Sequence, residues 1–215
     1  MRKRKAFEIA GLAAAVVLIA FGIASIVIGA NGQSTVHNNL VEQKVVGTPD
    51  MTPAGIRAEA TKSGLDVSNL SIPSCSVANK AITNGSDARC FAQYMTIHAL
   101  EATGGKYYSQ MPRWATANGE GTNVEAQALK GKNGRPVDNP AREVWIQETA
   151  LSTGLNTSYM ASQISLFGIV VGIALLLSGL GFGVLSLGGA LRNRDSAVTN
   201  ARGHRHSTTV SPTGA

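Results

Sequence analysis

The residue types that most often carry out chemistry are sparse in this sequence of 215 residues. His98 and Glu101 are the best-placed pair, because residues three positions apart on a helix point from the same side of it. Such a pair supplies two metal ligands, whereas a site needs three or four, and no second His/Glu pair completes it. On an apolar helix face, His98 is better interpreted as a packed, hydrogen-bonded residue.

The other histidines give no stronger signal. His37 stands alone among polar residues and is interpreted as solvated, and His204 and His206 form only an HxH pair near the C-terminus. The sequence contains no GxSxG, HExxH, CxxCH or phosphate-binding loop, and Gly104-Gly105-Lys106 is typical of a helix stop. We therefore predict no catalytic residue, no cofactor and no metal.

Two long stretches without charged residues determine the class of protein. Residues 9–30 and 164–191 each exceed the 18 or so apolar residues that predict a membrane-spanning helix. The first stretch is also longer than the apolar part of a cleaved signal peptide, so we favour a retained anchor over that alternative. Neither stretch contains an ionisable residue, which argues against a pore or transporter.

The basic residues predict how these helices are oriented. Residues 1–8 and 192–215 each carry a net charge of +3, and the segment between the two spans is neutral. Lysine and arginine next to a membrane helix remain on the cytoplasmic side, so we predict two cytoplasmic termini and an extracytoplasmic segment at 31–163. The residues that carry this topology signal are Arg2, Lys3, Arg4, Lys5, Arg192 and Arg194.

These charges predict the plasma membrane rather than nucleic acid as the partner. They flank the apolar spans and lack interleaved aromatic residues, so we expect contact with the lipid bilayer and no nucleic-acid binding. Residues 192–215 are polar and predict a disordered cytoplasmic tail.

Glycines in the second span occur at helix-packing spacing. Gly168 with Gly172, and Gly179 with Gly183, form two GxxxG pairs that give a flat helix face. Such a face allows a homo-oligomer or a membrane protein partner to dock. The alternative, which we favour for at least one pair, is that the two spans of one chain pack on each other.

The segment between the spans is predicted to be largely helical and rich in loops. Helices are expected from Thr52-Pro53 to Gly64, from Ser86 or Asp87 to Thr103, and from Asn139-Pro140 directly into the second span. Residues 104–138 are expected to form loops, with weak extended signals at Val45-Val46 and Leu70-Ile72. The buried face of the central helix should present Cys90, Phe91, Tyr94, Ile97 and His98.

The only two cysteines lie in this segment. Cys75 and Cys90 are even in number and confined to the side predicted to be oxidising, which predicts a disulfide between them. Closing this loop contributes about 3 kcal/mol in the chain-entropy model. Two free thiols are the alternative, and the absence of a CxxC spacing argues against a redox-active pair.

The run from His98 to Tyr107, HALEATGGKY, together with Arg142 and a long helix entering the membrane, resembles a family of two-span actinobacterial membrane proteins. The resemblance covers the overall layout and roughly residues 95–190, and it implies no established activity. Some members are labelled aromatic ring-opening dioxygenases. An extradiol enzyme needs two histidines and a carboxylate around ferrous iron in a soluble α/β framework. The outward segment is predicted to be helical, and its only histidines are His37, interpreted as solvated, and His98, interpreted as packed.

Two hypotheses of function follow from these patterns. The first is a non-catalytic protein of the cell envelope whose outward segment binds, senses or helps to assemble something. The alternative is a membrane-anchored extracytoplasmic enzyme or redox accessory that uses His98 and Glu101 or the cysteine pair. The missing catalytic motifs favour the first hypothesis.

Overall fold

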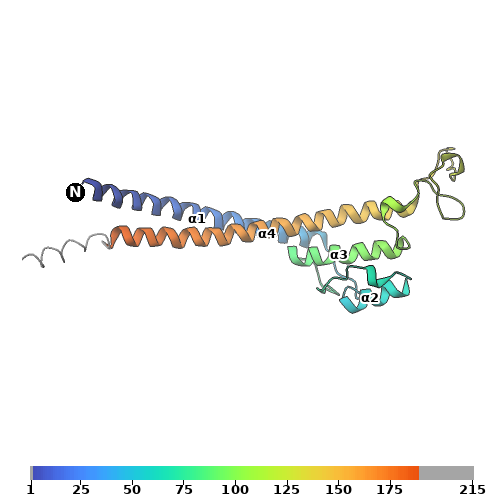
Figure 1. Cartoon of the computed structure of the whole chain (residues 1–215), viewed down its shortest axis with the longest axis horizontal. Coiled ribbons are helices and arrows are strands. Elements are labelled where there is room, and N and C mark those ends of the chain that lie inside the picture. Colours follow the sequence, from blue (N-terminus) through green and yellow to red (C-terminus); the bar gives the residue numbers. More distant parts are fainter. Residues whose placement is uncertain (1, 189–215) are drawn as a thin grey trace, which may run out of the picture. The chain divides into compact units, whose positions relative to one another are not determined.

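The computed structural model describes residues 2–188 and is mainly helical (Figure 1). Its α-helices are α1 (Arg2–Gln43), α2 (Pro53–Lys62), α3 (Gly85–Ala102) and α4 (Pro140–Leu187), with short 3-10 helices η1 (Val67–Asn69), η2 (Tyr108–Gln110) and η3 (Glu125–Gln127). Within residues 2–188 the extended segments form only isolated β-bridges, such as the one between Val46 and Ala81. The predicted mainly α class is confirmed. The predictions made for Arg192, Arg194, His204, His206 and the tail concern positions outside the described residues.

The described chain forms two compact units, one made of residues 2–29 and 167–188 and the other of Ala30–Leu166. In the first unit, α1 and α4 are long and apolar enough to cross a membrane. Many of their large apolar side chains are exposed, among them Phe21, Phe167 and Leu177. Each such side chain gains about 1.5–3 kcal/mol when it is removed from water, so these surfaces suit a hydrocarbon environment.

The GxxxG glycines of α4 face α1 of the same chain. A Cβ atom added at Gly172 would lie 2.7 Å from the carbonyl oxygen of Gly22, and one added at Gly179 would lie 2.8 Å from Ile19 Cγ1. The contacts at Gly168 and Gly183 are looser, at 3.7 and 3.8 Å. In this structure the glycine face of α4 therefore packs on α1 of the same chain.

Helix α1 continues well beyond the apolar stretch that predicted it. It ends at Gln43, although residues 31–43 are polar and contain weak helix formers such as asparagine and glycine. Val36 and Leu40, four positions apart, are buried in the core of the second unit. Burial of this apolar pair explains why the helix persists where local propensity does not favour it.

The core of the second unit is built around α3. Tyr94, Ile97, Phe91 and Cys90 are buried there as predicted, with α2 residues Ile56 and Ala60 and α4 residue Leu155 in the same cluster. Gly85, the first residue of α3, lies so close to α4 that an added Cβ atom would be 2.7 Å from Ser162 Cβ. In Figure 1, α3 accordingly runs beside α4.

A buried carboxylate also joins α3 to α4. Glu148 of α4 is only 7% exposed and accepts hydrogen bonds from Thr96 Oγ1 of α3 at 2.8 Å and from Ser152 Oγ at 2.7 Å. A buried charge is tolerated only when donors satisfy it. These bonds therefore fix how the two helices lie against each other.

The predicted helix boundaries are close to the observed ones. Thr52 caps α2 by accepting a hydrogen bond from the Gly55 amide at 2.9 Å, and Gly64 follows the helix with a φ of +77°. Helix α3 starts slightly earlier than expected because the side chain of Asn84 caps it, accepting from the Asp87 amide at 3.0 Å. Residues 104–138 form loops and short 3-10 helices, as expected. Of the two segments expected to be extended, Val45-Val46 forms a bridge, through Val46, and Leu70-Ile72 does not.

Replacement of Gly172 by isoleucine should disrupt the packing of α1 on α4. The added side chain meets backbone of α1, which cannot move aside as a flexible side chain can. We expect Gly172→Ile to lower the thermal midpoint of the full-length protein in mild detergent by several degrees. Gly181→Ile is the matched control, since nothing lies within 4 Å of a Cβ atom added at Gly181. Equal midpoints for the two variants would contradict the packing described.

Candidate functional site

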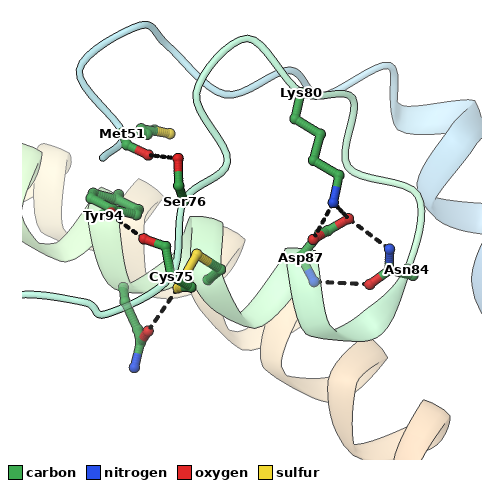
Figure 2. The surroundings of a disulfide bond; sticks show 9 residues. Met51, Cys75, Ser76, Lys80, Asn84, Asp87 and Tyr94 are labelled. Carbon is green, nitrogen blue, oxygen red and sulfur yellow. Dashed lines mark hydrogen bonds and ion pairs between the residues drawn. A yellow bond between two sulfur atoms is a disulfide. The ribbon is translucent and has the colours of Figure 1, made fainter. Parts of the chain in front are cut away.

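The two cysteines are joined in the structure. The Sγ atoms of Cys75 and Cys90 lie 2.07 Å apart, which is disulfide-bond distance, so the predicted pairing is confirmed (Figure 2). The hydroxyl of buried Tyr94 donates a hydrogen bond to the carbonyl oxygen of Cys75 at 2.6 Å, and Ser76 Oγ donates to the carbonyl oxygen of Met51 at 3.3 Å. The disulfide thus attaches the loop before α3 to the centre of the core.

His98 is a packed, hydrogen-bonded residue, as expected. Its Nε2 atom lies 2.6 Å from Asp50 Oδ2, and the two side chains are 24% and 27% exposed. Burial acts to raise the pKa of Asp50, but hydrogen bonds from the side chains of Thr48 and His98 outweigh it and lower the pKa overall. The pair ties α3 to the segment before α2. Asp50 could not be recognised as the partner in the sequence, because 48 positions separate it from His98.

Glu101 lies one turn beyond His98 on the same helix. Burial raises the pKa of its carboxyl above 4.5; His98 offsets part of this effect, while Glu59 and Asp50 add to it. Within residues 2–188 its Oε1 atom is buried without a hydrogen-bond partner. The described residues contain no group of three or more His, Cys, Asp or Glu side chains able to hold a metal ion.

His37 is exposed, as expected for a solvated residue, but its Nδ1 atom also lies 2.9 Å from the carbonyl oxygen of Thr83. A carbonyl only accepts, so Nδ1 carries the proton in this contact. His37 therefore helps to hold the loop before α3 against α1.

The HALEATGGKY run forms the corner where α3 ends against α4. Thr103 Oγ1 donates to the carbonyl oxygen of Ala99 at 2.7 Å, and the indole nitrogen of buried Trp145 donates to the carbonyl oxygen of Lys106 at 2.9 Å. The chain reverses at Gly104 and Gly105, both at positive φ, where glycine is the residue of least strain. The run is thus a structural corner that places its last residue, Tyr107, and the following Tyr108 beside α4.

Hydrogen bonds from Asn139 join the start of α4 to the loop that contains Pro112 and Arg113. Asn139 caps the helix by accepting from the Ala141 amide at 3.1 Å, while its Nδ2 atom donates to the carbonyl oxygen of Pro112 at 3.0 Å. Its backbone amide donates to the carbonyl oxygen of Arg113 at 2.9 Å. One side chain therefore fixes both the helix start and the loop that carries Arg113.

A cavity of about 630 Å³ opens at this junction, and we call it the arginine cavity. Its volume lies within the range of small-ligand sites. Its lining residues are Tyr108, Arg113, Asp138, Asn139, Pro140, Arg142, Glu143 and Ile146. A more apolar cavity of about 510 Å³ adjoins it, because Tyr108 and Ile146 line both.

Both arginines of the cavity are held by aromatic rings. The guanidinium of Arg142 lies 4.1 Å from the ring centroid of Tyr108, and that of Arg113 lies 4.3 Å from the ring centroid of Trp114. Tyr107 in turn packs on Trp145, with ring centroids 5.2 Å apart. Stacking restricts the guanidinium groups without using their N–H donors.

The two guanidinium groups of this cavity form no close ion pair with the described protein, although Asp138 and Glu143 line the same cavity. Neither arginine has a carboxylate oxygen within 4.0 Å among residues 6–188, where the close contacts between basic and acidic side chains are Lys80–Asp87 and His98–Asp50. Arg142 Nε is buried without an acceptor. Arg142 also lies in the first turn of α4, the positive end of the helix dipole. The arrangement is suited to holding a ligand, and none of its groups is placed as a nucleophile with its base.

In the sequence, Tyr107, Tyr108 and Trp114 lie close to one another around Pro112, and Arg142 is singled out only by the family resemblance. No motif singles out Arg113, Asp138 or Glu143. The available signal was the grouping of three aromatic residues and one arginine at 107–114, a composition typical of binding surfaces. No family model matches this chain, and no curated protein or solved structure is similar to it. Its own geometry therefore carries the functional argument.

Removal of the disulfide should destabilise the second unit. Cys75 and Cys90 are 15 positions apart, and a cross-link of that span contributes about 3 kcal/mol by restricting the unfolded chain. We expect the double variant Cys75→Ser, Cys90→Ser to unfold at a lower temperature than the oxidised wild type. Mass spectrometry of unreduced peptides should show the cross-linked pair. Two freely alkylated thiols in the native protein would contradict the assignment.

Glu101 should make stability depend on pH. A carboxyl whose pKa is raised in the folded state stabilises the fold while it is protonated, and this contribution is lost as the pH rises through the folded pKa. We expect Glu101→Gln to melt a few degrees above wild type at pH 7, with the difference shrinking below pH 4.5. Glu125→Gln, at an exposed position, is the control. A pH-independent difference between wild type and Glu101→Gln would refute this account.

Proposed function

We propose that this chain is a two-span integral protein of the plasma membrane whose central segment is a non-catalytic binding module on the outer face. The observation that carries the proposal is the arginine cavity, which lies in the disulfide-bonded unit of a chain that also has two helices long and apolar enough to span a bilayer. In this reading the spans anchor the protein, and the cavity receives its ligand.

Charge and redox chemistry support the outward placement. The net charge of +3 at 1–8 and again at 192–215 favours cytoplasmic termini, with 31–163 outside. A disulfide between Cys75 and Cys90 is stable in the oxidising exterior and rare in a reducing cytoplasm. Two independent features thus favour the same topology.

The resemblance of the HALEATGGKY run to two-span actinobacterial membrane proteins is consistent with this proposal. The run supplies the hydrogen bonds of the α3–α4 corner and leads directly to Tyr107 and Tyr108. Its demand for glycine comes from the backbone turn at Gly104 and Gly105. A structural role for the run requires no dioxygenase chemistry.

An extracytoplasmic enzyme using His98 and Glu101 is the second candidate, and one observation favours it. A carboxyl with a raised pKa beside a histidine–aspartate pair is an arrangement found at catalytic sites. Alanine at His98 and at Glu101 separates the two functions. Loss of function with unchanged folding supports the enzyme, whereas unfolding or no effect supports the binding module.

The proposed topology can be tested with single cysteines and an impermeant thiol reagent. Ser34 is exposed on α1, and Ser207 lies in the C-terminal tail. In intact cells we expect labelling of Ser34→Cys and none of Ser207→Cys, because the bonded native pair gives little background. Labelling of Ser207→Cys alone would overturn the topology.

A membrane protein partner or a second copy of the chain remains part of the proposal. The GxxxG face of α4 is used by α1, so docking between chains would involve the other exposed apolar faces of the two helices. Purification of the tagged full-length protein in mild detergent, with identification of co-purifying proteins and the molar mass of the particle, tests this part.

A further inference from the structure

We propose that the arginine cavity binds a carboxylate-bearing ligand whose neighbouring hydroxyl or amino groups donate hydrogen bonds. This inference rests on the proposed function as a binding module and names the chemistry of its ligand. Arg113 and Arg142 would hold the carboxylate, and Asp138 and Glu143 would accept from the adjacent donors.

The two guanidinium groups are arranged for an external acceptor. Each is fixed by an aromatic ring, Arg142 by Tyr108 and Arg113 by Trp114, and neither is paired with a carboxylate among residues 6–188. Guanidinium groups bind carboxylates through paired, charge-assisted hydrogen bonds. Because stacking has already restricted these side chains, little further conformational entropy is lost when the ligand binds.

The cost of leaving this charge unpaired also favours a ligand. Arg142 lies at the positive end of a helix of 48 residues, and its Nε atom is buried without an acceptor in the described chain. An unsatisfied buried donor is destabilising. A ligand carboxylate in the cavity would neutralise the guanidinium that carries this donor.

The acidic residues of the lining decide the kind of anion. Asp138 and Glu143 border the same cavity as the two arginines, so the four charged side chains sum to zero. A compact dianion such as phosphate would be repelled by the carboxylates, whereas a monoanion with attached donors satisfies both signs of charge. The adjoining apolar cavity, which includes Trp145, offers space for the rest of such a molecule.

The chain contains its own reporter for this test. Its two tryptophans, Trp114 and Trp145, both lie at this site, one beneath Arg113 and the other lining the adjoining cavity. We would titrate the full-length protein in mild detergent with glucuronate, acetate, glucose and inorganic phosphate at constant ionic strength, and follow tryptophan fluorescence. Calorimetry would give the same constants independently of the change in fluorescence.

We expect saturable binding of glucuronate, weaker binding of acetate and no binding of glucose. Arg113→Gln and Arg142→Gln should each weaken glucuronate binding at least about tenfold, the loss of one charge-assisted contact. Arg89→Gln is the matched control, because Arg89 also stacks on a ring, that of Tyr159 at 4.7 Å, but does not line the cavity. Arg113 is exposed, so its variant should fold even if the Arg142 variant does not.

Three results would overturn the inference: no saturable response to glucuronate, tighter binding of phosphate than of glucuronate, or equal weakening in Arg89→Gln and the two cavity variants. The measurement in detergent does not depend on which side of a membrane the unit occupies. A failed topology experiment would therefore leave the ligand assignment standing, and failed titrations would leave the topology standing.

Discussion

The hydrogen bond from the indole of Trp145 to the carbonyl oxygen of Lys106 joins the end of α3 to the first turns of α4, and the arginine cavity depends on it. Trp145 is 6% exposed, and an indole N–H without an acceptor there would be costly. Satisfying this donor positions the chain after α3, so that Tyr107 packs on Trp145 and Tyr108 lies against Arg142. The position of Tyr108 at the arginine cavity thus depends on the hydrogen bond between the Trp145 indole and the Lys106 carbonyl oxygen.

The small size of its apolar core explains why the second unit needs cross-links. Its apolar core is small, with Tyr94, Met51 and Ile56 among its largest fully buried side chains. Long loops precede and follow α3, and loops contribute little burial for the entropy that their ordering costs. The disulfide, the Tyr94–Cys75 hydrogen bond and the carboxylate of Glu148 each restrain a segment that apolar contacts alone would hold weakly.

The arginine cavity and the His98–Asp50 pair are electrostatic opposites. At His98 the chain supplies the hydrogen-bond partner itself, through Asp50 at 2.6 Å, and the contact stabilises the fold. At Arg113 and Arg142 the described chain supplies stacking but no carboxylate within ion-pair distance. A charge satisfied by the protein is typical of structure, and a fixed charge left unsatisfied is typical of recognition. This contrast is why we place ligand binding at the cavity rather than at His98.

The helical class, the two long apolar helices, the disulfide pairing and most helix boundaries could be predicted from the sequence. Apolar runs, caps such as Thr52 and stops such as Gly104 act over a few residues, so they can be seen in the sequence directly. Three features depend on the folded structure: α1 continues to Gln43, Asp50 contacts His98, and Arg113 and Arg142 line one cavity. Arg113 and Arg142 are 29 positions apart, and Asp50 and His98 are 48 positions apart. The extension of α1 depends on burial of Val36 and Leu40 in the core of the second unit. No local pattern encodes such contacts, because their free energy comes from packing between distant elements.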